Sequence, residues 1–310
     1  MALSTELDIR MHHGKKELQA ALRVNGTVRI EMARFLQERG FVEIPPVIYS
    51  TATDPLNHPV FDPSFIYEGT KYSLTKSMIF HKQILVQSFP RIYSFSPNVR
   101  LELPEKYATG RHLLEFTQLD LEMRDSTRED SMKLAEELFV DIIKHVEEKN
   151  AAELRELKRK LAVPERPFRR IRFLDARNKY GPDFERILSE EAKEPFWIID
   201  IPIKEREFYD RESDTESGIL NDMDLIYPEG FCEALSGGER EYKLDKILER
   251  ISLKEQKPEQ FEWFIEEVGK GMSLSSGFGI GIERLIRYIC GLRRIEDTHP
   301  YPKSPGKVAI

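Results

Sequence analysis

Two polar faces are predicted in the segment 91–124, whose sequence indicates a strand, a polar loop and a second strand. Side chains two positions apart on a strand point to the same side. The alternate positions of both strands are apolar. The residues that share the polar faces are Asn98, Arg100 and Glu102 on the first strand and Phe116, Gln118 and Asp120 on the second.

This set of side chains suits a nucleotide. A guanidinium group binds phosphate through two parallel hydrogen bonds and keeps its charge, so Arg100 is a candidate phosphate ligand. The carboxylate of Glu102 can accept a hydrogen bond from an exocyclic amine, and Phe116 can stack on a base. An ordinary solvent-facing strand is also polar on one side, but it more often carries Lys, Glu and Thr there.

A second segment with candidate functional residues is Ser275–Leu285, SSGFGIGIERL. On a strand, the alternate glycines Gly277, Gly279 and Gly281 remove side chains from one face. Their spacing is G-x-G-x-G and differs from the dinucleotide-binding fingerprint G-x-G-x-x-G. We expect them to form a flat floor for a purine. Arg284, at the start of the next helix, could hold a phosphate there.

The elements that position these residues follow from periodicity and turn signals. Hairpin-linked strands outnumber what a βαβ alternation would give, which favours an α+β fold: an antiparallel sheet flanked by helices, in a single domain over 1–310. The expected elements are a helix over 15–39, an edge strand in 41–50, a loop over 54–70, a helix within 75–89, a charged helix over 126–160, strands in 168–176 and 194–202, a hairpin over 222–241, two further helices, and a strand over 273–282 leading into a last helix.

Composition excludes several classes of protein. The chain is 40% hydrophobic and 33% charged, which is typical of globular proteins, and its net charge of −7 argues against a protein that mainly grips nucleic acid. No apolar run approaches the ~20 residues of a membrane span, and the N-terminus lacks the apolar core of a signal peptide. We expect a cytoplasmic protein in which Cys232 and Cys290 are buried thiols.

Three segments resemble the motifs of class II aminoacyl-tRNA synthetases. RLE at 100–102 and RHLLEFTQLDLEM at 111–123 resemble motif two (about 91–124), and GFGIGIERL at 277–285 resembles motif three (about 273–291). The residues within these motifs resemble those of the aspartyl and asparaginyl branch of the family. FVEIPPV resembles motif one (about 28–50), which forms the dimer interface in that family, so the resemblance implies a homodimer.

The resemblance also implies an ATP site. Within it, Arg100 would contact the α-phosphate, and Arg284 would hold the γ-phosphate; these two arginines would carry the catalytic role. Glu102 would read the adenine amino group. The residues expected to bind ATP are Arg100, Glu102, His112, Phe116, Glu233, Gly281 and Arg284.

An amino-acid site and a metal site are implied beside the ATP site. Lys82 and Arg240 would hold a substrate carboxylate, and Asp120 would hold the substrate ammonium. The residues expected to bind aspartate are Asp54, Ser77, Lys82, Gln118, Asp120 and Arg240. The expected Mg²⁺ ligands are Glu233, Ser236 and Asp224, although the spacing from Asp224 to Glu233 is longer than in archaeal aspartyl-tRNA synthetases.

The segments LTKSMIFHKQ, SPNVRLE, EPFWIIDIP, REFYDRE and EALSGGERE resemble the archaeal-type asparagine synthetases related to asparaginyl-tRNA synthetase. That family makes asparagine from aspartate, ATP and ammonia, with AMP and pyrophosphate as products. The tRNA ligases carry an anticodon-binding domain ahead of the core, whereas barely a helix precedes motif one here. We therefore expect no anticodon-binding domain, and tRNA is not an expected partner. Two departures from the tRNA ligases, TKSM at 75–78 and Ser275–Ser276, flank the amino-acid end of the site.

Asparagine synthesis would require activation of the β-carboxylate. Aspartate would then lie reversed, with its α-carboxylate on Arg240 and Lys82, and ammonia would attack a β-aspartyl adenylate. Asp54 is a candidate for binding ammonium and taking its proton. The alternatives are a tRNA ligase without its anticodon domain, an amide ligase that uses another amine, and a non-catalytic regulator that binds ATP.

Overall fold

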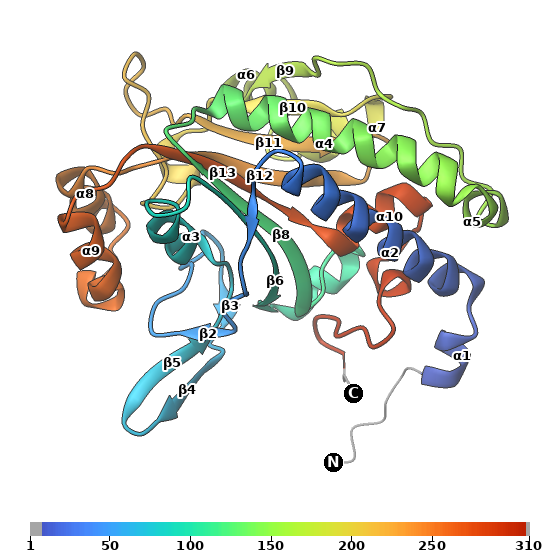
Figure 1. Cartoon of the computed structure of the whole chain (residues 1–310), viewed down its shortest axis with the longest axis horizontal. Coiled ribbons are helices and arrows are strands. Elements are labelled where there is room, and N and C mark those ends of the chain that lie inside the picture. Colours follow the sequence, from blue (N-terminus) through green and yellow to red (C-terminus); the bar gives the residue numbers. More distant parts are fainter. Residues whose placement is uncertain (1–7, 308–310) are drawn as a thin grey trace.

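The structure, a computed structural model, describes residues 8–307 and is built around one eight-stranded sheet (Figure 1). The strand order is β1-β6-β8-β13-β12-β11-β10-β9, and neighbours are antiparallel except for the parallel pairs β1–β6 and β10–β9 at the two edges. The expected α+β fold is confirmed; residues 1–7 and 308–310 of the expected domain lie outside the described residues. The strands of this sheet are β1 (Val42–Glu43), β6 (Arg91–Val99), β8 (Glu115–Arg124), β9 (Arg169–Arg172), β10 (Phe196–Ile199), β11 (Asp222–Tyr227), β12 (Cys232–Arg240) and β13 (Ser275–Gly281).

Three helices, α2 (Lys16–Gln37), α4 (Arg128–Lys149) and α10 (Ile282–Cys290), cover one face of the sheet (Figure 1). Their apolar residues recur every three or four positions and pack against Leu119 and Leu121 of β8 in the main core. The remaining helices are α1 (Ile9–His13), α3 (Ile79–Leu85), α5 (Ala151–Glu156), α6 (Phe173–Tyr180), α7 (Phe184–Glu191), α8 (Leu244–Leu253) and α9 (Glu262–Gly269). Among residues 8–307, no helix combines the length and the apolar character that crossing a membrane requires.

Two expected elements differ from the structure. The charged helix ends at Lys149, because Asn150 leaves the helical conformation with φ −114°, and α5 continues separately. The loop expected over 54–70 contains β3 (Val60–Phe61) and β4 (Ser64–Tyr67), and β4 forms a hairpin with β5 (Thr70–Leu74). Its two-residue turn, Glu68 and Gly69, has positive φ at both positions, as tight hairpins require.

The glycines of β13 lie opposite polar residues of β8. Gly277, Gly279 and Gly281 pair with Glu122, Asp120 and Gln118 respectively. A Cβ on Gly277 would lie 2.2 Å from the carbonyl oxygen of Leu121 and 2.3 Å from Oε2 of Glu122. The expectation that all three glycines floor one purine site is therefore wrong for Gly277, because the carboxylate of Glu122 fills the space above it.

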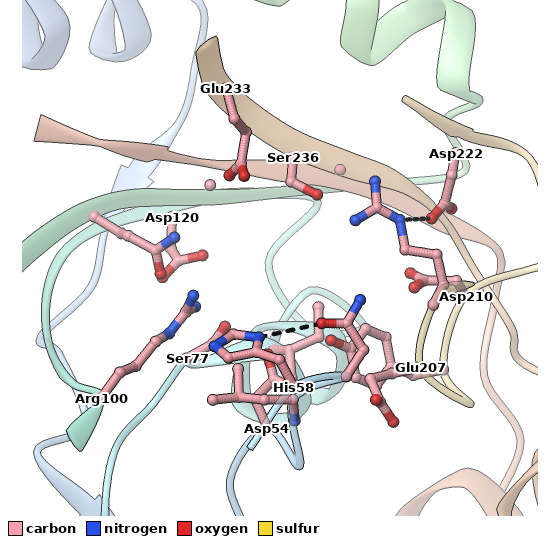
Figure 2. Close-up of a pocket in the computed structure, with 18 of the residues that line it drawn as sticks. Asp54, His58, Ser77, Arg100, Asp120, Glu207, Asp210, Asp222, Glu233 and Ser236 are labelled. Atoms are coloured by element: carbon pink, nitrogen blue, oxygen red, sulfur yellow. Dashed lines mark hydrogen bonds and ion pairs between the residues drawn. The ribbon is translucent and has the colours of Figure 1, made fainter. Parts of the chain in front are cut away.

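A bulge in β12 brings two important side chains to one side of the sheet. Residues three apart on a regular strand point to opposite faces. Here the pairing with β11 shifts register between Leu225 and Ile226, so Ala234 has no cross-strand partner. As a result, Glu233 and Ser236 point to the same side of the sheet (Figure 2).

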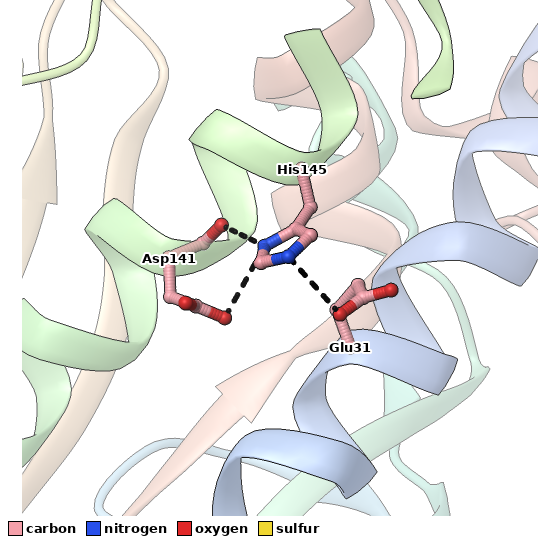
Figure 3. Close-up of side chains that lie close together, drawn as sticks. All are labelled: Glu31, Asp141 and His145. Carbon is pink, nitrogen blue, oxygen red and sulfur yellow. Dashed lines mark hydrogen bonds and ion pairs between the residues drawn. The ribbon is translucent and has the colours of Figure 1, made fainter. Parts of the chain in front are cut away.

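An ion-pair network joins α2 to α4 around the buried carboxylate of Glu31 (Figure 3). Its oxygens lie 2.7 Å from Arg34 Nε, 2.5 Å from Lys149 Nζ and 3.6 Å from His145 Nε2. Glu31, Asp141 and His145 place ligand atoms within 4.8 Å of one another, a spacing that a metal ion could use. Arg34 and Lys149 already neutralise Glu31, however, so we assign the cluster a structural role.

Replacing Gly277 is expected to damage the sheet. Gly277→Ala should lower the free energy of unfolding by about 1–3 kcal/mol or more, because the new Cβ would overlap backbone and force β8 and β13 apart. Gly281→Ala is the matched control: its Cβ would come no closer than 3.7 Å to Arg284, so stability should stay within about 1 kcal/mol of the original. Denaturant unfolding of the two variants checks this, and equal stabilities would contradict the packing argument.

Glu31→Gln is expected to lower the free energy of unfolding by about 1–3 kcal/mol at neutral pH, because Arg34 and Lys149 lose a charged acceptor. Burial raises the pKa of Glu31, but the hydrogen bonds from Lys149 and Arg34 outweigh it, so its folded-state pKa is lowered. The contribution is therefore complete above the unfolded-state pKa of about 4.3 and is lost as pH falls through the folded-state pKa.

Denaturant titrations of wild type and Glu31→Gln at a series of pH values measure this difference. The control is Glu38→Gln, since Glu38 also accepts from Arg34 but its side chain is 55% exposed; its effect should stay within about 1 kcal/mol. A difference between wild type and Glu31→Gln that persists at strongly acidic pH would refute the assignment.

Candidate active site

A cavity of about 290 Å³ opens on the face of the sheet opposite α2, α4 and α10, and a recess of about 40 Å³ adjoins it (Figure 2). The alternation predicted for β8 is confirmed, since Gln118 and Asp120 line the cavity whereas Leu119 and Leu121 are fully buried in the core. Every expected site residue except Asp224 lines the cavity or the recess: Asp54, Ser77, Lys82, Arg100, Glu102, His112, Phe116, Gln118, Asp120, Glu233, Ser236, Arg240, Gly281 and Arg284.

The recess holds the residues expected to bind the nucleotide. The guanidinium carbon of Arg100 lies 5.2 Å from the ring centroid of Phe116, and Arg100 Nε donates to the carbonyl oxygen of Lys76 at 3.1 Å. Arg100 follows the end of β6, and Glu102 belongs to β7 (Leu101–Glu102), which pairs with β3 instead of extending the main sheet. The apolar face expected for the first strand therefore ends at Val99, and Leu101 is only half-buried.

Glu102 is held as a carboxylate. Its Oε1 lies 3.1 Å from His58 Nε2, a contact that the sequence did not suggest. Burial raises the pKa of Glu102, but the hydrogen bond from His58 and the nearby charge of Arg100 outweigh burial, and the pKa is lowered. A charged acceptor at this position can bind an exocyclic amine.

Positive charge gathers where the recess meets the cavity. Arg284, in the first turn of α10, lies 3.1 Å from Oε1 of Glu233. Burial raises the pKa of Glu233, but the positive charges of Arg284 and Arg111 outweigh burial and lower the pKa to about 2. Burial, together with the charges of Arg284 and Arg111, lowers the pKa of His112 to about 2, so its ring is neutral at pH 7. The arginines, not His112, therefore supply the positive charge for a phosphate.

The donor set beside Arg284 fits Mg²⁺, which prefers oxygen ligands and shares them with waters and phosphates. Glu233 and Ser236 both present oxygens to the cavity. Asp224, the expected third ligand, does not line it: its carboxylate binds Arg206 and accepts a hydrogen bond from Ser236, its cross-strand neighbour. Asp222, on the same face of β11, lines the cavity instead.

The other end of the cavity contains a buried ionic network. Lys82 Nζ donates to Oδ1 of Asp120 at 3.0 Å and lies 3.6 Å from Oε2 of Glu122. Arg240 Nε donates to Glu122 at 3.2 Å, and its Nη1 donates to Asp210 at 2.9 Å. Ser275, one of the two departures from the tRNA ligases, donates to Glu122 at 2.8 Å. The two cations expected to bind a substrate carboxylate are thus anchored by one shared acid.

Several buried oxygens at this site have no hydrogen-bond partner among the described residues. They are Oε2 of Glu102, Oδ2 of Asp120 and Oδ1 of Asp222. A buried polar atom without a hydrogen-bond partner lowers the stability of the fold by about 1–3 kcal/mol. A site that contains such atoms is therefore suited to a ligand that forms hydrogen bonds with them. For Glu102 and Asp120, this agrees with the amine and ammonium contacts expected from the sequence.

One wall of the cavity was not anticipated from the sequence. Arg206, Glu207, Tyr209 and Asp210 line it from an irregular segment, beside Asp222. Burial raises the pKa of Asp210 and of Asp222 more than Arg240 and Arg206 lower them. These residues follow no strand or helix period that would indicate their direction. The one local indication of this wall was Asp222, because it lies two positions from Asp224 on the same strand and therefore shares its face.

The comparisons with known proteins agree with this geometry. The family described as tRNA synthetases class II (D, K and N) matches residues 5–305. The aspartate–tRNA(Asp/Asn) ligase of Methanopyrus kandleri is 31% identical over 97% of this chain and 72% of its own length. The asparagine–tRNA ligase of Pelotomaculum thermopropionicum is 31% identical over 92% of this chain and 69% of its own length.

Among solved structures, the asparaginyl-tRNA synthetase from Pyrococcus horikoshii complexed with asparaginyl-adenylate superposes with a TM-score of 0.90. It is 27% identical, and the match covers 98% of this chain and 74% of that one. The chain therefore belongs to the class II tRNA synthetases of the D, K and N group and carries the catalytic fold of an adenylate-forming, ATP-dependent ligase.

Proposed function

We propose that this protein is an ammonia-dependent, AMP-forming asparagine synthetase. In this reaction the β-carboxylate of L-aspartate attacks the α-phosphorus of ATP and displaces pyrophosphate. Ammonia then attacks the carbonyl carbon of the β-aspartyl adenylate and displaces AMP. We propose that residues 1–310 act together as the catalytic domain for both steps.

The observation that carries the proposal is the ion pair between Lys82 and Asp120. Lys82 Nζ and Asp120 Oδ1 are 3.0 Å apart, both side chains are buried, and Oδ2 of Asp120 is unpaired within the described residues. An adjacent cation and anion match the α-carboxylate and α-ammonium of an amino acid. Arg240, which also lines the cavity, would give that carboxylate a second cation.

Binding the α groups at that end directs the β-carboxylate toward Arg100. Arg100 would hold the α-phosphate and stabilise the charge that develops during in-line attack. Glu102 and Phe116 would bind adenine, and Arg284 would bind the γ-phosphate. Mg²⁺, held by Glu233 and Ser236 with Asp224 supporting Ser236, would neutralise phosphate charge when bound.

A second candidate function is ligation of an amino acid to tRNA, the activity for which the two relatives are named. In that case aspartate would bind in the opposite orientation, with its α-carboxylate toward Arg100. An amide ligase that uses another amine is a third candidate. These functions share the adenylate and differ in the acceptor.

Incubation with aspartate, ATP, Mg²⁺ and ammonium chloride is expected to yield asparagine and AMP in equal amounts. The matched reaction replaces ammonium by total tRNA and measures acid-precipitable aspartate or asparagine. Efficient labelling of tRNA with no free asparagine would overturn the proposal, and AMP release that depends on a different amine would favour the third candidate.

Arg284→Ala is expected to reduce the rate of adenylate formation by about 100-fold or more, because a preorganised charge on the phosphates is removed. Aspartate-dependent exchange of pyrophosphate into ATP measures this step without an acceptor. Arg287→Ala, one turn further along α10, is the control and should retain exchange, since Arg287 lines neither the cavity nor the recess. Full activity in Arg284→Ala would refute the assignment of this arginine.

We also propose that residues 28–50 form a homodimer interface. Val42, Ile48 and Tyr49 are 45%, 50% and 53% exposed, and Val42 lies on β1, an edge of the main sheet. Exposed apolar side chains on a sheet edge are typical of an interface. Ile48→Asp should shift the protein from dimer to monomer in analytical ultracentrifugation, whereas Ile66→Ser, outside this region on the β4–β5 hairpin, should not. A monomeric wild type would rule out this interface.

A further inference from the structure

Two carboxylates of the cavity have no cation partner among residues 8–307. Asp54 and Glu207 are only 6% and 5% exposed, and both line the cavity (Figure 2). The neighbouring acids differ, because Asp120 is paired with Lys82, Asp210 with Arg240, and Asp222 with Arg206. Within residues 8–307, no ion pair joins Asp54 or Glu207 to Lys, Arg or His.

Each of these two acids also keeps one unused oxygen. Asp54 Oδ1 accepts from the backbone N–H of Leu56 at 3.0 Å, and Glu207 Oε2 accepts from Gln256 Nε2 at 3.1 Å. In the described part of the chain, no hydrogen bond engages the second oxygen of either carboxylate. Buried carboxylates of this kind are stable only with a positive partner or a proton.

The segments that carry the two acids lie side by side. Asn57 Nδ2, three residues after Asp54, donates to the carbonyl oxygen of Glu205 at 2.8 Å. Burial is the largest effect that raises the pKa of Glu207, and the negative charge of Asp54 raises it further because the two carboxylates repel each other. Lys76 and Lys254 lie near enough to act on this pair electrostatically, but neither forms an ion pair with it.

We propose that Asp54 and Glu207 form the ammonium site of the enzyme and accept the protons released as ammonium becomes an amide. This inference rests on the proposed function and assigns the nitrogen substrate to a place within the same cavity. It adds Glu207, which lies outside the three sequence motifs, to the catalytic residues.

The proton balance requires two acceptors. Ammonium carries four hydrogens, and the amide nitrogen of asparagine carries two. One carboxylate takes a proton from ammonium, which gives ammonia with a free electron pair. That pair forms the C–N bond at the β-carbonyl carbon while the bond to the AMP oxygen breaks, and the second carboxylate takes the next proton from nitrogen. Solvent then removes both protons.

The environment of Glu207 suits this role. Asp54, Asp210, Lys254 and Gln256 act on it from the surrounding segments, and the net effect of burial and charge raises its pKa. A general base works best when its pKa lies near the operating pH. The α-ammonium of aspartate has a separate acceptor, the unpaired oxygen of Asp120 beside Lys82. The cavity thus provides for two nitrogen cations, as the proposed reaction needs.

The test is Glu207→Gln. This variant should keep aspartate-dependent pyrophosphate exchange within about threefold, with an unchanged KM for aspartate. The KM for ammonium should rise at least 10-fold, and asparagine formation should slow by about 100-fold or more, as expected when a proton acceptor is lost. Hydroxylamine, which is neutral at neutral pH, should still be converted to aspartyl hydroxamate at close to the wild-type rate.

The matched control is Glu205→Gln, two residues away, where the side chain is paired with Arg177 outside the cavity; it should leave all five measurements unchanged. Equal loss of asparagine and hydroxamate formation would overturn the ammonium site in favour of a structural role. A raised KM for aspartate in the exchange reaction would assign the pair to the α-ammonium. If the wild type itself makes no asparagine from ammonium, the proposed function falls and this inference with it.

Discussion

The buried carboxylate of Glu122 is the interaction on which the amino-acid end of the cavity depends. It is fully buried, and it contacts Lys82 of α3, Arg240 of β12 and Ser275 of β13. A buried charge without partners costs several kcal/mol, so these contacts hold three separate elements in one arrangement. Both cations that we propose for the substrate carboxylate are thereby oriented before any substrate binds. Gly277 makes room for this acid, because any Cβ there would overlap it.

The sheet separates packing from chemistry. On β8, one set of alternate residues packs under α2, α4 and α10, and the other set lines the cavity. The bulge at Ala234 breaks this alternation in β12, and only for that reason do Glu233 and Ser236 reach the same cavity. Charge then divides the cavity: Arg100, Arg111 and Arg284 gather at the nucleotide end, whereas carboxylates outnumber cations at the other end. That division suits the reaction that we propose, in which ATP is an anion and the two nitrogen substrates enter as cations.

Much of the fold could be predicted because its signals are local. The helix over 15–39, the polar faces of residues 91–124 and the final glycine strand each follow from a period of 3.6 or 2. Local signals were also missed: the Glu68–Gly69 turn marks a hairpin inside the expected loop. The resemblance assigned Asp224 to the cavity, but in the structure Arg206 binds its carboxylate. Because Arg206 lies 18 residues away in the chain, the local spacing of residues does not indicate this pairing.

The sequence by itself determined the family, the order of the motifs and which side chains face the cavity from regular strands, because strand geometry converts spacing into direction. Only the tertiary structure decided which of those groups are paired. It placed His58 against Glu102, Arg206 against Asp222 and Asp224, and Glu207 beside Asp54. The reason is physical: burial and charge pairing depend on segments distant in the chain, and an irregular segment such as 206–210 has no period that indicates where its side chains point.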